Sequence, residues 1–205
     1  MHFLHSFRFR FILVFGLFIV LFCAIFTTTS IRGVVETSLN VFFQQGDPLV
    51  KKAAGLIDGD RFELLSGSLD SDPAYYDFLY KQLYDFKQDV TCRFLYTMAP
   101  VSGSIFKYIV DGSTTPDDEE NFSMYGDEED LSSWGKAPFE AMEQQVLTHS
   151  SIEEMEGWGW MVTVYAPIVN SAGKSVGFIA CDFAAEELVL LIDSKRVRLA
   201  VIGII

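Results

Sequence analysis

The chain has 205 residues, half of them hydrophobic, which suffices for one globular domain of ordinary size and a membrane segment. Its formal net charge is −13. Because several of the bases lie at the two ends (Arg8, Arg10, Lys195, Arg196 and Arg198), the middle part, residues 27–194, is more acidic than the chain as a whole. Such a surface repels phosphate backbones, so we expect no nucleic-acid partner.

The N-terminus has the pattern of a membrane anchor. Residues 1–10 are basic and aromatic, and no charge follows from Phe11 to Ile31. We predict a cytoplasmic N-terminus at 1–10 and a transmembrane helix at 11–30, because arginines mark the cytoplasmic side. The main domain would then be extracytoplasmic on a cell inner membrane. A cleaved signal peptide is the alternative, but the polar exit Thr27–Ser30 lacks an A-x-A site.

Helical patterns follow the apolar segment. Apolar residues near helical spacing predict a long helix from Ile31 to about Ile57, which Pro48 should break or kink. A short helical turn is expected at Asp60–Leu65. Asp72 and Pro73 have the pattern of an N-cap and first helical residue. The helix that they open has an apolar stripe that should lie on a sheet, made of Tyr76, Leu79, Tyr80, Leu83 and Phe86.

The central part predicts two strands and an acidic loop. Thr91–Ala99 and Ser104–Asp111 alternate as strands do, around a turn at Pro100–Gly103. The polar stretch Gly112–Asp130 carries many acids and no base. A calcium site is conceivable there, but the oxygens lack EF-hand spacing, so a solvated loop without metal is favoured. A short helix at Lys136–Leu147 and an acidic turn at Glu153–Glu156 follow.

The strongest pattern is a hairpin near the C-terminus. Two apolar runs, Trp160–Val169 and Ser175–Phe183, flank the polar break Asn170–Lys174, which predicts antiparallel strands. Both runs are apolar at nearly every residue, so both faces of the sheet should be covered. Asp182 is the exception. A buried carboxylate needs a donor or a cation; it could bond loop amides or an arginine, or it could hold the ammonium group of a ligand.

The remaining residues leave three expectations. Helical residues 184–193 should lead into 194–205, the start of a second membrane helix whose final apolar run is too short to cross. A disulfide between Cys92 and Cys181 is conceivable outside the cytoplasm, although buried free thiols are favoured. Catalytic signatures are absent, and His149 stands alone in the exported part, so we expect neither an enzyme nor a cofactor in this chain.

The order of these parts resembles the Cache family, the PAS-like extracytoplasmic sensor domains of bacterial transmembrane receptors. The resemblance covers about residues 31–193 and includes D-P-A-Y-Y-D-F, F-L-Y-T-M-A-P, I-F-K-Y-I-V-D-G and P-D-D-E-E-N-F-S. Its most specific parts are the Y-A-P-I and G-F-I-A-C-D-F strands with their N-S-A-G-K turn. In amino-acid-binding members the last of these strands ends in an aspartate that holds the ligand's amino group, and Asp182 matches it. The R-x-W-Y pattern that binds the carboxylate has no counterpart here.

The resemblance implies an α+β fold: a PAS-like antiparallel sheet with a long N-terminal helix, preceded by one transmembrane helix. It implies small-molecule sensing for a chemoreceptor, histidine kinase or diguanylate cyclase, and dimerisation through the long helix. A membrane-anchored structural or interaction domain, its sheet filled by aromatic side chains, is the alternative.

The candidate ligand contacts are aromatic side chains around one carboxylate. If Val169 pairs with Ser175, Asp182 shares a face with Trp160; a shift of one residue would put Tyr165 there instead. An acid among aromatic rings suits a cationic or zwitterionic small molecule, such as an amine. The full candidate set is Tyr96, Tyr108, Trp160, Tyr165 and Asp182.

Overall fold

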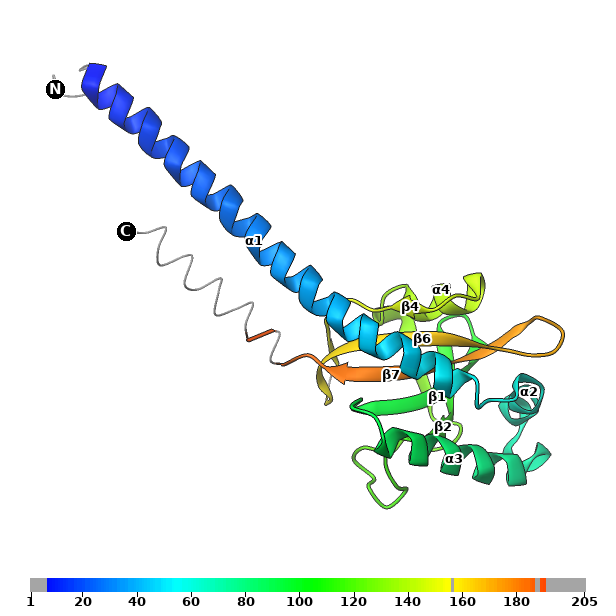
Figure 1. Cartoon of the computed structure of the whole chain (residues 1–205). Helices are drawn as coiled ribbons and strands as arrows, with labels where there is room; N and C mark the ends of the chain where they lie inside the picture. Colours follow the sequence, from blue (N-terminus) through cyan, green and yellow to red (C-terminus); the bar gives the residue numbers. More distant parts are fainter. Residues whose placement is uncertain (1–6, 156, 187–188, 191–205) are drawn as a thin grey trace. The chain divides into compact units, whose positions relative to one another are not determined.

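The computed structural model describes residues 7–155, 157–186 and 189–190. Its helices are α1 (Phe7–Ala54), α2 (Gly59–Gly67), α3 (Pro73–Gln88) and α4 (Ala137–Gln144), with the short 3-10 helices η2 (Leu69–Ser71) and η3 (Leu131–Ser133) (Figure 1). The chain divides into two compact units, and the larger one, Val41–Glu186, contains the sheet.

The smaller unit contains the apolar part of α1. Within the described residues, α1 is the one helix long and apolar enough to cross a membrane, with a mean hydropathy of 2.8 over its most apolar window. Its hydrophobic side chains are exposed, as at Phe11, which is 63% exposed. The boundaries expected at residues 1–10, 11–30 and 31–193 stay predictions. The segment 194–205 lies outside the described residues, as do five of the ten residues of the helix expected at 184–193.

The larger unit is built on one antiparallel sheet in the strand order β3-β2-β1-β7-β6-β4, with β5 also paired to β6. This arrangement confirms the predicted fold class, a long N-terminal helix followed by an antiparallel sheet. Both predicted hairpins are present within a few residues of their expected ends. The bounds are β1 (Phe94–Ser102), β2 (Ile105–Asp111), β3 (Glu128–Asp130), β4 (Thr148–His149), β5 (Glu153–Met155), β6 (Gly159–Val169) and β7 (Ser175–Ala184).

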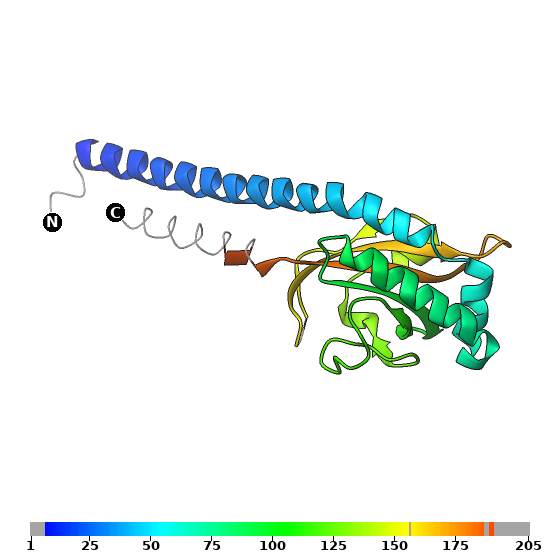
Figure 2. The same ribbon diagram turned by 60° about the horizontal axis from the view of Figure 1, so that its bottom comes forward.

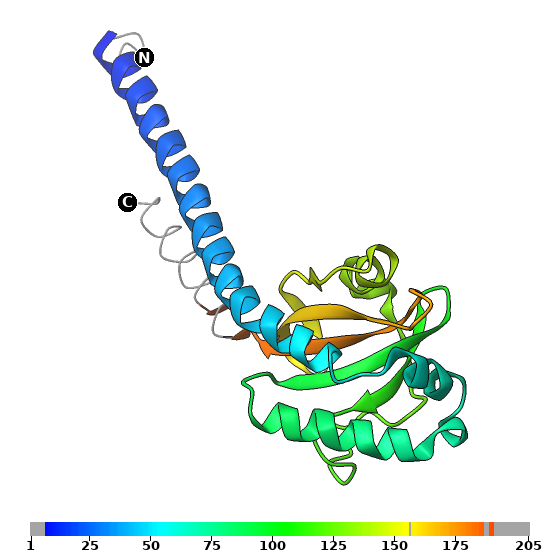
Figure 3. The same ribbon diagram turned by 45° about the vertical axis from the view of Figure 1, so that its right-hand side comes forward.

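Both faces of the sheet are covered, as the nearly continuous apolar strands predicted. On one face the last turns of α1, together with α2 and α3, enclose a core that includes Val50, Phe62 and Leu79. Figures 2 and 3 show α3 lying along this face. The opposite face packs against α4 and η3 through a second core around Met98 and Phe178. Successive strand residues therefore enter two different cores.

Helix α3 begins as the sequence predicts. Asp72 is its N-cap and accepts a hydrogen bond from the Tyr75 backbone N–H at 3.2 Å, while Pro73 occupies the first turn. Leu79 and Leu83 of the predicted stripe are fully buried on the sheet.

Helix α1 continues past Pro48 to Ala54, close to the expected end near Ile57, so the proline does not break it. The reason lies in tertiary packing. A Cβ atom at Gly46 would lie 2.7 Å from Val164 Cγ2 and 2.9 Å from the Phe183 ring, so the glycine lets the helix backbone press onto β6 and β7. Such packing outweighs the loss of one helical hydrogen bond.

The register of the closing hairpin settles which side chains share a face with Asp182. Val169 does pair with Ser175, but the register shifts between Ile168 and Val169. Beyond this bulge Asp182 pairs with Thr163, so it shares its face with Tyr165 and not with Trp160. The expected acidic turn at 153–156 also contains a short strand, β5, which pairs with β6.

Candidate ligand-binding site

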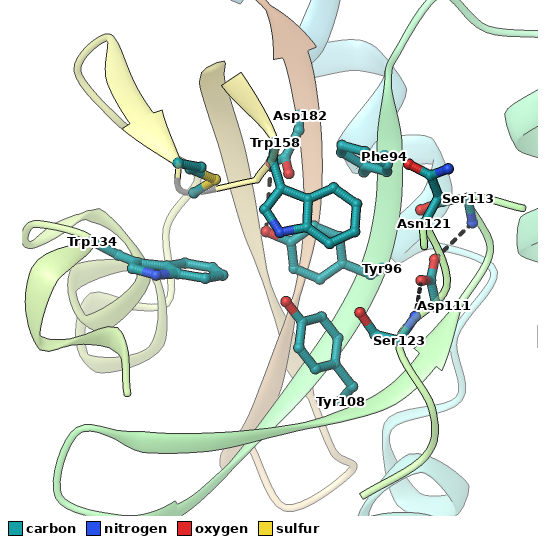
Figure 4. A pocket seen from close by; sticks show the side chains of 11 residues that line it. Phe94, Tyr96, Tyr108, Asp111, Ser113, Asn121, Ser123, Trp134, Trp158 and Asp182 are labelled. Carbon is teal, nitrogen blue, oxygen red and sulfur yellow. Dashed lines mark hydrogen bonds between the residues drawn. The ribbon is translucent and has the colours of Figure 1, made fainter. Parts of the chain in front are cut away.

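A small open pocket, with a cavity volume of about 30 Å³, lies on the α4 side of the sheet. Its floor comes from β1, β2 and β7, and its walls come from the loops before and after β3 and from the turn between β5 and β6 (Figure 4). The lining residues are Phe94, Tyr96, Tyr108, Asp111, Ser113, Asn121, Ser123, Trp134, Met155, Trp158 and Asp182.

Asp182 is the chemically unusual group of this pocket. Its side chain is buried, with 3% of the residue exposed. Burial raises its pKa from 3.8 to about 7, although hydrogen bonds from Thr163 and Tyr96 oppose the rise. The Tyr96 hydroxyl lies 3.5 Å from Asp182 Oδ1, which is a weak hydrogen bond. Within the described residues, the side-chain hydrogen-bond partners of the carboxylate are thus two uncharged hydroxyl groups, those of Thr163 and Tyr96.

No fixed cation neutralises the pocket. The lining residues, all within the described part of the chain, include no lysine and no arginine. Arg93 lies nearby and lowers the pKa of Asp182 slightly, but its guanidinium pairs with Glu186 at 2.8 Å. Arg93 therefore does not bond the Asp182 carboxylate directly, as the alternative of an arginine partner would require.

A second carboxylate in the pocket, Asp111, has a structural role. It accepts hydrogen bonds from the backbone N–H groups of Ser113 and Ser123, each at 2.8 Å. These bonds hold both ends of the acidic loop that follows β2 (Figure 4). Burial raises the pKa of Asp111, and the Ser113 side chain together with the two backbone donors counteracts the rise. Asp111 adds negative charge to the pocket while its own oxygens are already bonded.

Aromatic rings surround the two carboxylates. Tyr96 and Tyr108 lie with ring centroids 5.4 Å apart, and Phe94 meets Trp158 edge to face at 4.8 Å. Trp134 lines the opposite wall (Figure 4). Aromatic faces attract cations, and they do so more strongly where water is excluded. Negative charge and aromatic faces therefore favour the same kind of ligand group.

The structure brings together three of the five predicted site residues: Tyr96, Tyr108 and Asp182. Tyr165 is on the same face but does not line the pocket; it is fully buried against Phe178, with ring centroids 5.4 Å apart. Its hydroxyl is buried without a well-placed hydrogen-bond partner in the described part of the chain, although Thr163 is near enough to lower its pKa. Trp160 is on the opposite face of β6.

The indole that lines the pocket is Trp158, which the sequence reasoning missed. It lies between Gly157 and Gly159, whose φ angles of +81° and +85° are left-handed. Glycine adopts this backbone at no steric cost, so the G-W-G segment can turn the indole toward the pocket. These two glycines were the sequence signal that could have identified Trp158 as a pocket residue. Trp134 precedes another positive-φ glycine, Gly135.

No family model and no curated protein matches the chain. Its fold is similar to solved sensory domains of chemoreceptors. One is Tlp3 of Campylobacter jejuni, at 12% identity and a TM-score of 0.47, over 79% of this chain and 59% of that one. Tlp1 of the same organism is a periplasmic sensory domain, at 13% identity and a TM-score of 0.48, over 76% and 59%. The ligand-binding domain of the Pseudomonas aeruginosa amino acid chemoreceptor PctC, in complex with GABA, has 17% identity and a TM-score of 0.38, over 80% and 58%.

The chain thus spans about three fifths of the length of these structures.

Proposed function

We propose that this chain is the extracytoplasmic sensing domain of a membrane signalling receptor, and that its pocket binds a small organic amine. The observation that carries the proposal is a buried carboxylate, Asp182, that has aromatic neighbours and no lysine or arginine beside it among the residues that line the pocket. Anchoring through α1 in an inner membrane and pairing of two copies along α1 belong to the same proposal. The structural alternative needs a concavity filled by its own rings, whereas a pocket adjoins Asp182.

Burial disfavours the ionised form of Asp182, and an ammonium group beside the carboxylate would favour that form again. With a pKa of about 7, roughly half of the Asp182 side chains are ionised at neutral pH in the ligand-free protein. A cation beside the carboxylate favours the ionised form and forms a charge-assisted hydrogen bond with it. The faces of Trp158 and Tyr108 could contact the alkyl or ammonium part of the ligand.

The pocket offers no matching group for a ligand carboxylate. A zwitterionic amino acid would bring its negative end close to Asp111 and Asp182 without any lysine or arginine among the lining residues. Like charges within a desolvated site cost several kcal/mol. The geometry therefore favours an amine without a carboxylate over an amino acid.

A route for the signal begins at the same strand. Asp182 is adjacent to Phe183, whose ring contacts Gly46 of α1. His149 of β4 also contacts α1, since its Nε2 lies 2.7 Å from Asp47 Oδ1. A ligand that binds one arrangement of β7 and α1 more tightly than another would shift the equilibrium toward that arrangement. The shift in free energy equals the difference in binding free energy, typically about 1–3 kcal/mol.

The test uses the full chain in detergent and a panel of small molecules. Thermal shift and calorimetry would compare simple amines, quaternary ammonium ions, amino acids and organic acids. We expect binding by at least one amine, and a loss of that binding of about 10- to 150-fold in Asp182→Asn, because a charge-assisted bond contributes about 1.5–3 kcal/mol. Asp77→Asn is the matched control, because Asp77 is exposed on α3. Binding confined to carboxylates, or unchanged in Asp182→Asn, would contradict the proposal.

A further inference from the structure

Two buried cysteines lie near each other on the face of the sheet opposite the pocket. Cys92 lies just before β1 and is 7% exposed, whereas Cys181 lies within β7 and is 1% exposed. Both belong to the core between the sheet and α1, α2 and α3. The Arg93 backbone N–H donates to the Asp182 carbonyl oxygen at 2.7 Å, which joins the residues that follow each cysteine. The two segments are thus fixed side by side.

The two thiols are also near enough for each to shift the pKa of the other. The neighbouring Cys181 lowers the pKa of Cys92, while Cys92 and burial together raise the pKa of Cys181. A thiolate is the nucleophile in thiol–disulfide exchange, so the thiol that a reagent can reach is the one that reacts first. Cys92, the more exposed of the two, is the sulfur that a reagent would reach first.

We propose that Cys92 and Cys181 are a redox-active dithiol that closes to a disulfide, tying the start of β1 to the last part of β7. The proposal uses the extracytoplasmic location put forward above, because disulfides persist in oxidising compartments. It does not depend on the identity of the ligand or on ligand binding.

The oxidant required is a disulfide, either a small molecule or a protein thiol oxidant. The Cys92 thiolate attacks one sulfur of that disulfide, forms a mixed disulfide and expels one thiolate. Cys181 then loses its proton and attacks the Cys92 sulfur, which expels the second thiolate. The cysteines lose two electrons and two protons, and the oxidant becomes two thiols.

The bond would act on the strand that carries the site. Cys181 immediately precedes Asp182, so a bond at Cys181 would restrict the end of β7 at the pocket. It would also close a loop that contains most of the sheet, and long loops lose the most entropy in the unfolded chain when they are cross-linked. The third cysteine, Cys23, is exposed on the apolar part of α1.

The experiment follows the thiols of the full chain in detergent, in a Cys23→Ala background that leaves only this pair. The folded protein is treated with oxidised glutathione, denatured and labelled with a thiol reagent, and then digested for mass spectrometry. We expect the loss of both reactive thiols and a Cys92–Cys181 cross-linked peptide lighter by two hydrogens. The melting temperature should rise on the order of 10 °C on oxidation.

A Cys92→Ala variant is the matched control. Oxidation should leave its melting temperature unchanged. Cys181 should be recovered as a free thiol after reduction, with no cross-linked peptide within the chain. The proposal is overturned if both thiols of the unaltered pair stay free after oxidation, or if the cross-links join different chains. It is overturned equally if the cross-linked peptide forms only in denaturant. None of these results would bear on amine binding, which is measured separately.

Discussion

Replacing Asp182 by asparagine should stabilise the ligand-free protein at neutral and alkaline pH. Its pKa of about 7 compares with an ordinary value of 3.8, and each unit of difference corresponds to about 1.4 kcal/mol. Because the folded-state pKa is raised, the contribution of Asp182 to stability is fully present below pH 4 and is lost as the pH rises through 7. The ionised carboxylate therefore lowers the free energy of unfolding by about 4 kcal/mol at pH 8.

The measurement is the free energy of unfolding of wild type and of Asp182→Asn at several pH values between 4 and 8, by urea denaturation. Only the difference between the two proteins is used, since it cancels the titration of every other acid. That difference should grow in favour of the variant between about pH 4 and pH 7 by about 4 kcal/mol and stay constant above pH 7. Asp77→Asn, on the exposed face of α3, should show no such growth.

A saturating amine should reverse this result for wild type alone. The ammonium group stabilises the ionised Asp182, so the ligand should restore wild-type stability at pH 8 and leave Asp182→Asn unchanged. A difference that is constant from pH 4 to pH 8 would show that the carboxylate is not desolvated. The physical basis of the proposed site would then be gone.

Three further changes test the packing around the site. Tyr165→Phe should be neutral or stabilising by about 1 kcal/mol in urea denaturation, because the Tyr165 hydroxyl is buried without a well-placed partner; a large loss of stability would show that a partner exists. Gly46→Ala should cost about 1–3 kcal/mol by the same measurement, despite the better helix propensity of alanine, since its Cβ would lie 2.7 Å from Val164 Cγ2; a gain would place α1 farther from the sheet. Asp111→Ala should speed amide exchange at the two loop N–H groups that it accepts, and unchanged exchange would contradict its anchoring role.

Most of the fold could be predicted because local and tertiary preferences agree. Asp72 and Pro73 begin α3 as they would in many contexts, and the apolar runs of β6 and β7 match a sheet that is covered on both faces. The sequence left open whether Pro48 breaks or kinks the helix. The helix continues there, where Gly46 packs on β6 and β7, and nothing in the sequence near Pro48 reveals strands more than a hundred residues away.

The site was harder to predict than the fold because its members come from separate segments. Asp182, Tyr96 and Tyr108 lie on strands, where alternation limits the choice to two faces. Trp134 and Trp158 lie outside the strands, where no periodicity orients a side chain. Their positions depend on glycine backbones such as Gly157, which a sequence shows only as turn signals.

A single bulge decides what surrounds the carboxylate. Regular pairing from Val169 and Ser175 inward would have set Asp182 beside Trp160, whereas the shift at Ile168 sets it opposite Thr163. Because strand side chains alternate between the two faces, a register shift of one residue replaces every β6 side chain on the face of Asp182. It turns Trp160 to the other face and puts Tyr165 on the face of Asp182. Since the pocket depends on this register, a substitution that removed the bulge would bury Asp182 against a different set of side chains, and amine binding should disappear with it.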